Sequence, residues 1–264
     1  MAKDIHAAVR EVCLSFPESE EFLSHGSPNF RVRGKTFASY LVNHHGDGRV
    51  ALWLNAASGV QDQCVRAEPK HFFVPPYVGT RGWLGIHLDQ GLSWKRIAAV
   101  VREAYEKTAP PVLVRQIGAT IAIEPPKKNL GADEIDPFQS AAVQKLLQPL
   151  RKFCLSLPEV EEDRQFGSPV WRAGKKTFAM AHRCNGPLMF AFWVGVEQQG
   201  LYRHDPRYSI PAYLGHNGWI ALDASKAPSD KEVRSLALHS YRHFALKRML
   251  AQLVEVGEQG DQDR

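Results

Sequence analysis

Residues 13–38 read CLSFPESEEFLSHGSPNFRVRGKTFA, and residues 154–179 read CLSLPEVEEDRQFGSPVWRAGKKTFA. The two stretches align without a gap, and fifteen of their twenty-six positions are identical. A second match follows in each half, with PPYVGTRGW at residues 75–83 and PAYLGHNGW at residues 211–219. A period of about 140 residues is far longer than a solenoid repeat, so each copy is predicted to be a whole domain with its own core.

The duplication predicts the domain organisation. Neither copy accounts for the segment between them, where two β-rich stretches flank Gly118 and could form a hairpin before a Pro-rich, flexible part. The predicted parts are a first domain at 1–109, a linker with this hairpin at 110–136, a second domain at 137–254 and an acidic tail at 255–264.

Each copy has the same predicted order of elements: helix, hairpin, strand, short helix, two strands and a closing helix. Apolar residues recur every three or four positions from Ile5 to Phe16, which is the pattern of an amphipathic helix. Residues 29–32, 36–42 and 50–54 are rich in strand-forming residues, and Ser93 is a predicted N-cap of the closing helix. We expect an α+β protein, with two tandem copies of a two-layer α/β domain in which helices cover an antiparallel sheet. The last helix of the second copy is predicted to run from about Ser229 to Val254.

Composition indicates a soluble chain. Hydrophobic residues make up 44% of it, which is enough for two cores. No stretch approaches the roughly 18 apolar residues of a membrane span, and the N-terminus lacks the apolar core of a signal peptide. Four scattered cysteines are too few for a disulfide framework. We therefore expect a cytoplasmic protein with reduced thiols and no membrane partner.

Motifs for catalysis are missing from both copies. The sequence contains no GxSxG, no Gly-rich phosphate loop, no HExxH and no CxxC pair. Ser27 and Ser168 of the repeated Gly-Ser-Pro have no repeated histidine partner, so they are assigned to turns. His239 and His243 have a spacing that can bind a metal on one helical face, but no third ligand is evident. The sequence predicts no catalytic residue, no metal site and no cofactor.

Charged residues recur around the first hairpin of each copy. Three glutamates after the first helix are interpreted as a solvated acidic loop, and basic residues flank the hairpin tip, which could project like a wing. The second copy is the more basic, with sixteen basic and nine acidic residues in 137–254, against thirteen and eleven in 1–110. The glutamates are Glu18, Glu20, Glu21, Glu159, Glu161 and Glu162. The predicted phosphate contacts are Arg31, Arg33, Lys35, Arg172, Lys175, Lys176, Arg203, Arg207, Arg242 and Arg248.

Large aromatic residues are also retained in both copies. Core and sheet packing is the main interpretation, because aromatic side chains supply much of the buried area of a small domain. A pocket for a small ligand is the alternative. The residues are Trp53, Tyr77 and Trp83 in the first copy and Trp193, Tyr213 and Trp219 in the second.

Taken in order, the motifs LSxPExEE, GSP, GKTFA or GKKTFA, and PxYxGxxGW resemble the MmcQ/YjbR family of small bacterial proteins. The resemblance covers nearly all of the chain except residues 110–136 and the tail. It implies a fold similar to type III secretion chaperones and DNA binding on a double-wing surface. The chain departs from shorter members of the family, which have a basic residue and a histidine directly before the tryptophan; Arg81-Gly82 and Asn217-Gly218 stand there instead.

These features lead to two hypotheses about function. The first is a non-enzymatic protein that binds double-stranded DNA without sequence preference and in a salt-dependent manner. The second is a protein-interaction or chaperone-like module, in which the duplication replaces a homodimer and gives a monomer with pseudo-two-fold symmetry. One continuous basic face would favour DNA, and an exposed apolar groove would favour a protein partner.

Overall fold

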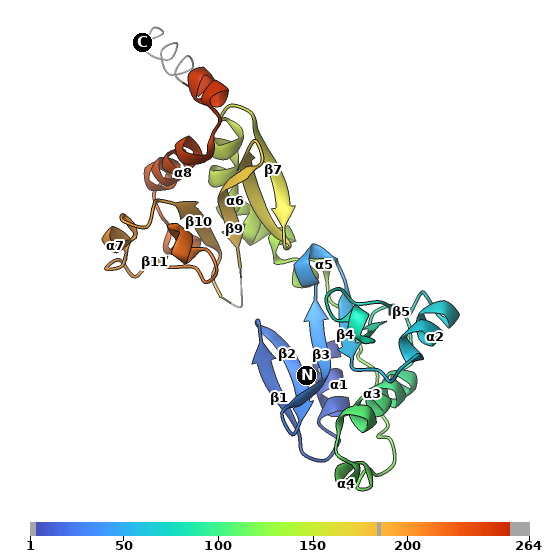
Figure 1. Cartoon of the computed structure of the whole chain (residues 1–264). Coiled ribbons are helices and arrows are strands. Elements are labelled where there is room, and N and C mark those ends of the chain that lie inside the picture. The colour runs from blue at the N-terminus through green and yellow to red at the C-terminus, as the bar shows by residue number, and fades with distance from the viewer. Residues whose placement is uncertain (1–3, 184–185, 254–264) are drawn as a thin grey trace. The chain divides into compact units, whose positions relative to one another are not determined.

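The computed structural model describes residues 4–183 and 186–253 (Figure 1). The chain divides into two compact units, Met1–Ile135 and Asp136–Arg264. The acidic tail expected at 255–264 lies outside the described residues. Among the described helices, none combines the length and the apolar character that crossing a membrane requires.

The first unit contains one six-stranded antiparallel sheet in the order β1-β2-β3-β4-β6-β5. Its strands are β1 Ser19–Ser24, β2 Ser27–Val32, β3 Lys35–Val42, β4 Val50–Leu54, β5 Phe72–Phe73 and β6 Leu84–His87. Its helices are α1 Ile5–Cys13, α2 Val60–Ala67, α3 Trp94–Thr108, α4 Pro111–Val114 and α5 Ala132–Ile135, with 3₁₀ turns η1 His44–Gly46 and η2 Gly79–Arg81.

The second unit repeats this sheet in the order β11-β12-β10-β9-β8-β7. Its strands are β7 Val160–Gln165, β8 Ser168–Ala173, β9 Lys176–His182, β10 Met189–Trp193, β11 Tyr208–Ser209 and β12 Trp219–Asp223. Its helices are α6 Ala141–Leu155, α7 Gln199–Tyr202 and α8 Asp230–Phe244, with 3₁₀ turns η3 Pro137–Gln139, η4 Gly215–Asn217 and η5 Ala224–Lys226. The expected α+β fold of two tandem copies is confirmed.

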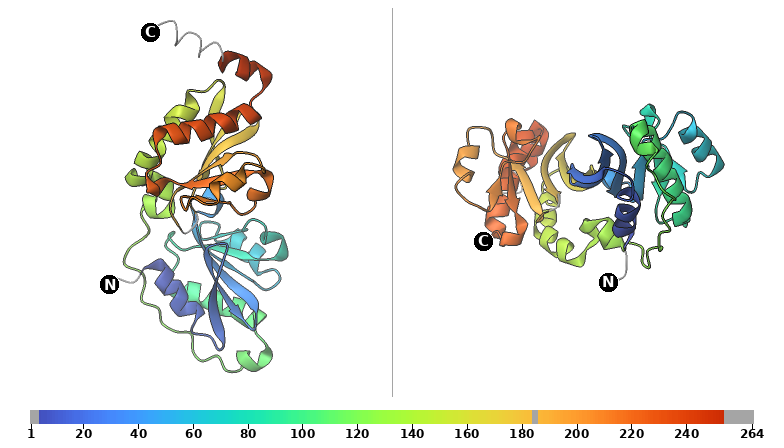
Figure 2. Two further views of the ribbon diagram at one scale, coloured as in Figure 1. Left: turned by 90° about the vertical axis from the view of Figure 1, so that its left-hand side faces the viewer. Right: turned by 90° about the horizontal axis from the view of Figure 1, so that it is seen from below.

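The core of each unit lies between its sheet and its first and last long helices (Figure 2). These helices are amphipathic, and their apolar faces are buried. The last long helix of each unit carries a tyrosine whose side chain is buried in the core. The hydroxyl of Tyr105 donates to the carbonyl oxygen of Pro17 at 2.6 Å, and that of Tyr241 donates to the carbonyl oxygen of Pro158 at 2.8 Å. The last helix is thereby tied to the chain that leaves the first helix.

The glutamates expected in an acidic loop lie in or next to a strand instead. β1 and β7 each pair antiparallel with the following strand and form one edge of the sheet. Both strands are rich in charged residues and lack the alternation of apolar and polar residues that marks a strand with one buried face. An edge strand needs no such alternation when cross-strand ion pairs replace apolar contacts.

The β-hairpin expected in the linker does not form. Pro111 starts the short helix α4, where its missing N–H is no loss, and Leu113 of this helix is buried in the first core. Ile117 and Ile123 also pack against that core. Individual apolar side chains of this segment therefore pack against the core of the first unit, and its backbone does not form paired strands.

The last helix is shorter than expected. α8 ends at Phe244, because Ala245 adopts an extended backbone with φ −65° and ψ 145°. Residues 247–253 are helical again, and Val254 lies outside the described residues. The chain therefore turns after α8 and folds back onto the second unit.

Trp53 and Trp193 are not equivalent, contrary to the sequence-based pairing. Trp53 lies opposite Ser39 in the first sheet, and Ala191 lies opposite Met180 in the second. Ser39 and Met180 are matching positions, directly after the ungapped repeat. Ala191 therefore takes the place of Trp53, and Trp193 stands two residues further along its strand. The pairing of neighbouring strands therefore determines which residues of the two copies are equivalent. The presence of one tryptophan in each strand does not.

We predict that Tyr105→Phe and Tyr241→Phe each lower the free energy of unfolding by about 1–2 kcal/mol, because each leaves a proline carbonyl without its partner. Urea denaturation measures this. Tyr213→Phe is the control, since the Tyr213 side chain is 79% exposed and its change should stay within about 0.5 kcal/mol. Equal effects in all three variants would contradict the role of the buried hydroxyls.

Candidate functional site

Arginines of the first hairpin are paired with carboxylates of β1 and of the turn before it. Arg31 Nε lies 2.7 Å from Glu20 Oε1 across the strand pair. Arg33 forms a two-point ion pair with Glu18, in which Nη2 lies 2.7 Å from Oε1. The hydrogen bond from Arg33 holds the pKa of Glu18 below its usual value. Both predicted phosphate contacts therefore already have an anionic partner.

The equivalent hairpin of the second unit also forms ion pairs between arginines and carboxylates, but with different residues. Arg172 Nε lies 3.2 Å from Asp163 Oδ2. Glu159, which matches Glu18, pairs with Arg248, whose Nη2 lies 2.7 Å from Glu159 Oε2. This long-range pair replaces the local one, because the position of Arg33 is taken by Gly174 in the second copy.

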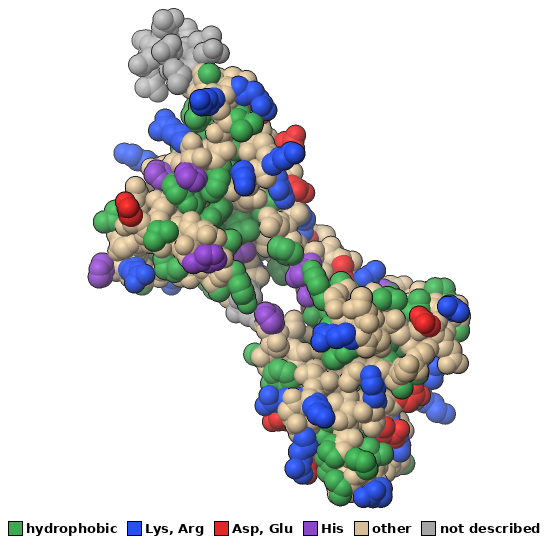
Figure 3. Space-filling view, in the orientation of Figure 1, with side chains coloured by type: hydrophobic (Ala, Val, Ile, Leu, Met, Phe, Trp, Pro, Cys, Tyr) green, Lys and Arg blue, Asp and Glu red, His purple; other side chains and the backbone are tan. Residues whose placement is uncertain are grey.

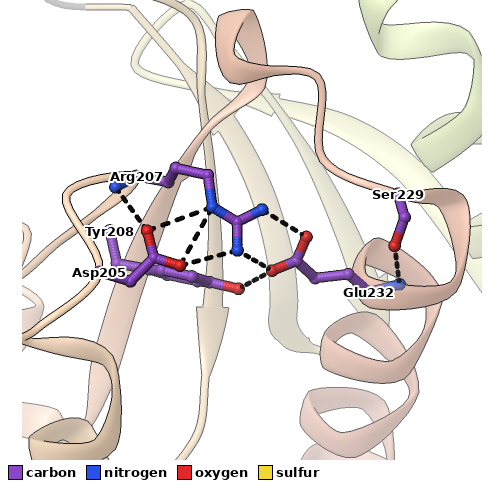
Figure 4. Close-up of polar contacts among 5 residues, drawn as sticks. All are labelled: Asp205, Arg207, Tyr208, Ser229 and Glu232. Atoms are coloured by element: carbon purple, nitrogen blue, oxygen red, sulfur yellow. Dashed lines mark hydrogen bonds and ion pairs between the residues drawn. The ribbon is translucent and has the colours of Figure 1, made fainter.

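Arg207 belongs to a partly buried network that ties β11 to α8 (Figure 4). Its guanidinium lies 2.7 Å from Asp205 Oδ2 and 2.9 Å from both oxygens of Glu232. The Tyr208 hydroxyl donates to Glu232 at 2.6 Å. The network occupies the donor groups of Arg207, so its role is structural.

Five of the predicted contacts have no carboxylate partner within residues 4–183 and 186–253, and all five are exposed: Lys35, Lys175, Lys176, Arg203 and Arg242. Four of them are in the second unit. The turn before β9, which carries Lys175 and Lys176, lies close to the segment that follows α8. A Cβ atom built on Gly174 in this turn would be 3.6 Å from Leu246 and 3.9 Å from Met249.

We call the turn before β9, the last turn of α8 and the segment that follows α8 the basic end of the second unit; its cations are Lys175, Lys176, Arg242, Lys247 and Arg248. Lys247 was not among the predicted contacts. Of these five cations, Arg248 is paired with Glu159, and the other four have no ion pair with a carboxylate among the described residues. Figure 3 shows Lys and Arg side chains near residues 247–253, toward the top of the view.

The first unit has no such surface at the matching place. Pro111 and Val112 stand where the second copy has Lys247 and Arg248, and Leu113 is buried like Met249. Glu106 stands where the second copy has Arg242. Arg33 is paired with Glu18 and Glu106 is paired with Arg102, so at these positions the first unit presents only Lys35 without a carboxylate partner among the described residues.

A second repeated feature is the corner between β5 and β6, and between β11 and β12. Tyr77 and Tyr213 adopt left-handed backbone conformations with φ of 64° and 65°. Their side chains are 67% and 79% exposed. We call these loops, residues 74–83 and 210–219, the tyrosine corners.

A buried glutamine fixes each tyrosine corner from behind. Gln199 Nε2 donates to the carbonyl oxygens of Gly215 at 2.7 Å and Trp219 at 2.8 Å. Gln61 does the same for Gly79 and Trp83 in the first unit. Side chains at Gly79 and Gly215 would collide with Val74 and Ile210, which pack directly on these glycines. The glutamines were missed because they lie 16 and more residues from the loops that they hold.

The remaining predicted pocket residues are largely packed. Trp53 and Trp219 are buried, and Trp83 is half-buried, on the sheet face opposite the long helices. His44 packs edge-on against Trp53, with ring centroids 4.9 Å apart. The tryptophans therefore serve packing rather than lining one common pocket.

His239 and His243 contact a tryptophan instead of a metal. The Trp193 ring stacks on His243 at 3.4 Å and on His239 at 5.8 Å between centroids. In the first unit this place holds Asn55 and Lys107, joined by a 2.7 Å hydrogen bond. No group of three or more His, Cys, Asp or Glu side chains in the described part of the chain could hold a metal ion.

Comparison with known proteins identifies the repeat. A family model described as YjbR matches residues 14–107 and again residues 155–243. None of the curated proteins matches the chain. The chain is similar to the crystal structure of Deinococcus radiodurans protein DR2400, described with the family-model domain DUF419, at 16% identity and a TM-score of 0.36. That alignment covers 44% of this chain and 88% of the other.

We predict that His182→Leu stabilises the second unit, and more so at low pH. Burial lowers the pKa of His182, and its Nε2 atom has no hydrogen-bond partner among residues 4–183 and 186–253. Protonation is therefore less favourable in the folded state, so stability is complete above about pH 6.5 and is lost as the pH falls below it. Leucine is the residue at the matching position, Leu41.

Urea denaturation of the wild type and His182→Leu at pH 7.5 and 5.5 measures this effect. We expect the variant to be more stable by roughly 1 kcal/mol at pH 7.5, because an unpaired buried nitrogen is removed. The difference should be larger at pH 5.5. The other histidines are present in both proteins, so a difference that does not change with pH would contradict the assignment to His182.

Proposed function

The chain belongs to the YjbR family, in two tandem copies, and from this premise we propose that it is a non-enzymatic, cytoplasmic DNA-binding protein. The family resemblance implies DNA binding at the wing hairpins. The observation that carries the proposal here is the basic end of the second unit. Cations without carboxylate partners are free to contact phosphate, whereas those in ion pairs must first give up a partner.

The proposal assigns unequal roles to the two copies. In the first hairpin, Arg31 and Arg33 are engaged by Glu20 and Glu18. In the second unit, the turn that carries Lys175 and Lys176 lies against the segment that carries Lys247, so several phosphates of one duplex could be contacted together. Contacts of lysine with phosphate carry no sequence information, so the binding is expected to be non-specific.

We predict that Lys175→Glu, Lys176→Glu and Lys247→Glu together weaken binding of a duplex oligonucleotide at least tenfold, about 1.4 kcal/mol. Lys70→Glu, Lys95→Glu and Lys127→Glu form the matched control, with the same change in net charge on exposed lysines of the first unit that are not predicted phosphate contacts. The control should retain affinity within about threefold, since long-range charge effects are screened beyond about 10 Å.

Fluorescence anisotropy at about 50 mM salt measures both triple variants, and thermal melts confirm that each is folded. Equal losses in the two variants would show that net charge, and not the basic end, determines the affinity. If the wild type does not bind duplex DNA at this salt concentration, where non-specific binding is strong, the DNA proposal fails. The protein-interaction module would then be favoured.

A further inference from the structure

We propose that Tyr77 and Tyr213 are platforms on which unpaired nucleobases stack, so that this protein prefers single-stranded to double-stranded nucleic acid. The inference rests on the proposed function and deepens it by naming the form of nucleic acid. The basic end would supply affinity for phosphate, and the tyrosine corners would supply contacts that only exposed bases can make.

The backbone of the corners is the first argument. A left-handed conformation is disfavoured for a residue with a Cβ atom, and both copies retain a tyrosine there. Packing does not require this ring, because most of its surface is exposed in both units. Strain that persists at an exposed aromatic residue is typical of binding sites.

Rigidity of the corners is the second argument. The glutamine behind each loop fixes two of its carbonyl groups, and the neighbouring glycine lets Val74 or Ile210 pack underneath. In the first unit His45 Nδ1 lies 3.0 Å from the Tyr77 hydroxyl, which orients the ring. A ring on a fixed loop loses little conformational entropy when a ligand stacks on it.

The surroundings of the rings favour a nucleic acid over a protein. Tyr77 lies beside a shallow hollow of about 400 Å³ that Arg49 and His44 also line. The one carboxylate there, Asp47, is 3.6 Å from Arg49. In the second unit, a hollow of about 150 Å³ is lined by Ile210 of the corner together with Tyr202, Arg203 and Tyr208, which precede the corner. An aromatic ring beside a cation suits a base and its phosphate.

A protein partner fits the corners less well. Stable protein interfaces bury about 800 Å² on each partner and centre on well-packed pockets. Each corner instead presents one ring with few exposed β-branched neighbours, Val74 at 52% in the first unit and Ile210 at 40% and Val196 at 61% in the second.

The test compares an oligo(dT) of about 20 nucleotides with a duplex of about 20 base pairs, each labelled with a fluorophore, by anisotropy at one salt concentration. We expect the wild type to bind the single strand more tightly. Tyr77→Asn together with Tyr213→Asn removes both rings while keeping a residue that tolerates the left-handed conformation. This variant should lose tenfold or more in affinity for oligo(dT) and change less than twofold for the duplex.

Tyr77→Phe together with Tyr213→Phe is the matched control, because it keeps the rings and removes only the hydroxyls. It should bind oligo(dT) within about threefold of the wild type. Unchanged oligo(dT) binding by the asparagine variant would overturn the stacking proposal and leave duplex binding at the basic end intact. Loss of both ligands by the lysine reversals, with no effect of the tyrosine changes, would likewise overturn stacking and assign all of the affinity to phosphate contacts.

Failure of the wild type to bind either oligonucleotide would overturn both proposals. The tyrosine corners would then be assigned to a protein partner. Melting temperatures of the asparagine variant confirm that it is folded, and we expect them to rise or stay unchanged because backbone strain is relieved.

Discussion

Ion pairing at the edge strand of each sheet determines which cations of this protein can act on a partner. Glu20 and Glu18 pair with Arg31 and Arg33 of the first unit, and Glu159 and Asp163 pair with Arg248 and Arg172 of the second. Surface ion pairs of this kind contribute little stability singly, but they occupy the donor groups of arginine. The lysines of the basic end have no such carboxylate partner among the described residues, and the proposed contact with DNA is assigned to them.

The two copies share one fold and differ in the charged residues to which the proposed function is assigned. Gly174 replaces Arg33, which lets the segment after α8 approach the hairpin turn and supply Arg248 to Glu159. Arg248 in turn stands where the first copy has Val112. These exchanges convert a partly apolar end into a basic one without changing the sheet order. Both tyrosine corners, in contrast, keep an exposed tyrosine with a left-handed backbone and a glutamine that holds the loop.

Much of the fold was predictable because the repeat and the apolar rhythm of α1 and α3 are local signals. The strand β1 was not, because Glu20 and Glu21 carry no apolar alternation and owe their place to arginines eleven residues away in sequence. For the site, the sequence allowed basic and aromatic residues to be chosen as candidates by residue type. The side chains that contact them could not be predicted, because the Arg207 network and the glutamine behind each corner depend on contacts between residues far apart in sequence.

The salt dependence of duplex DNA binding tests the central claim most directly. Four cations of the basic end lack a carboxylate partner among the described residues, so the slope of log K against log salt concentration should be about −3.5. A slope near about −9 would mean that all ten predicted residues contact phosphate, including the ion-paired arginines, and would contradict the claim. A slope near zero would contradict a phosphate-contacting surface altogether.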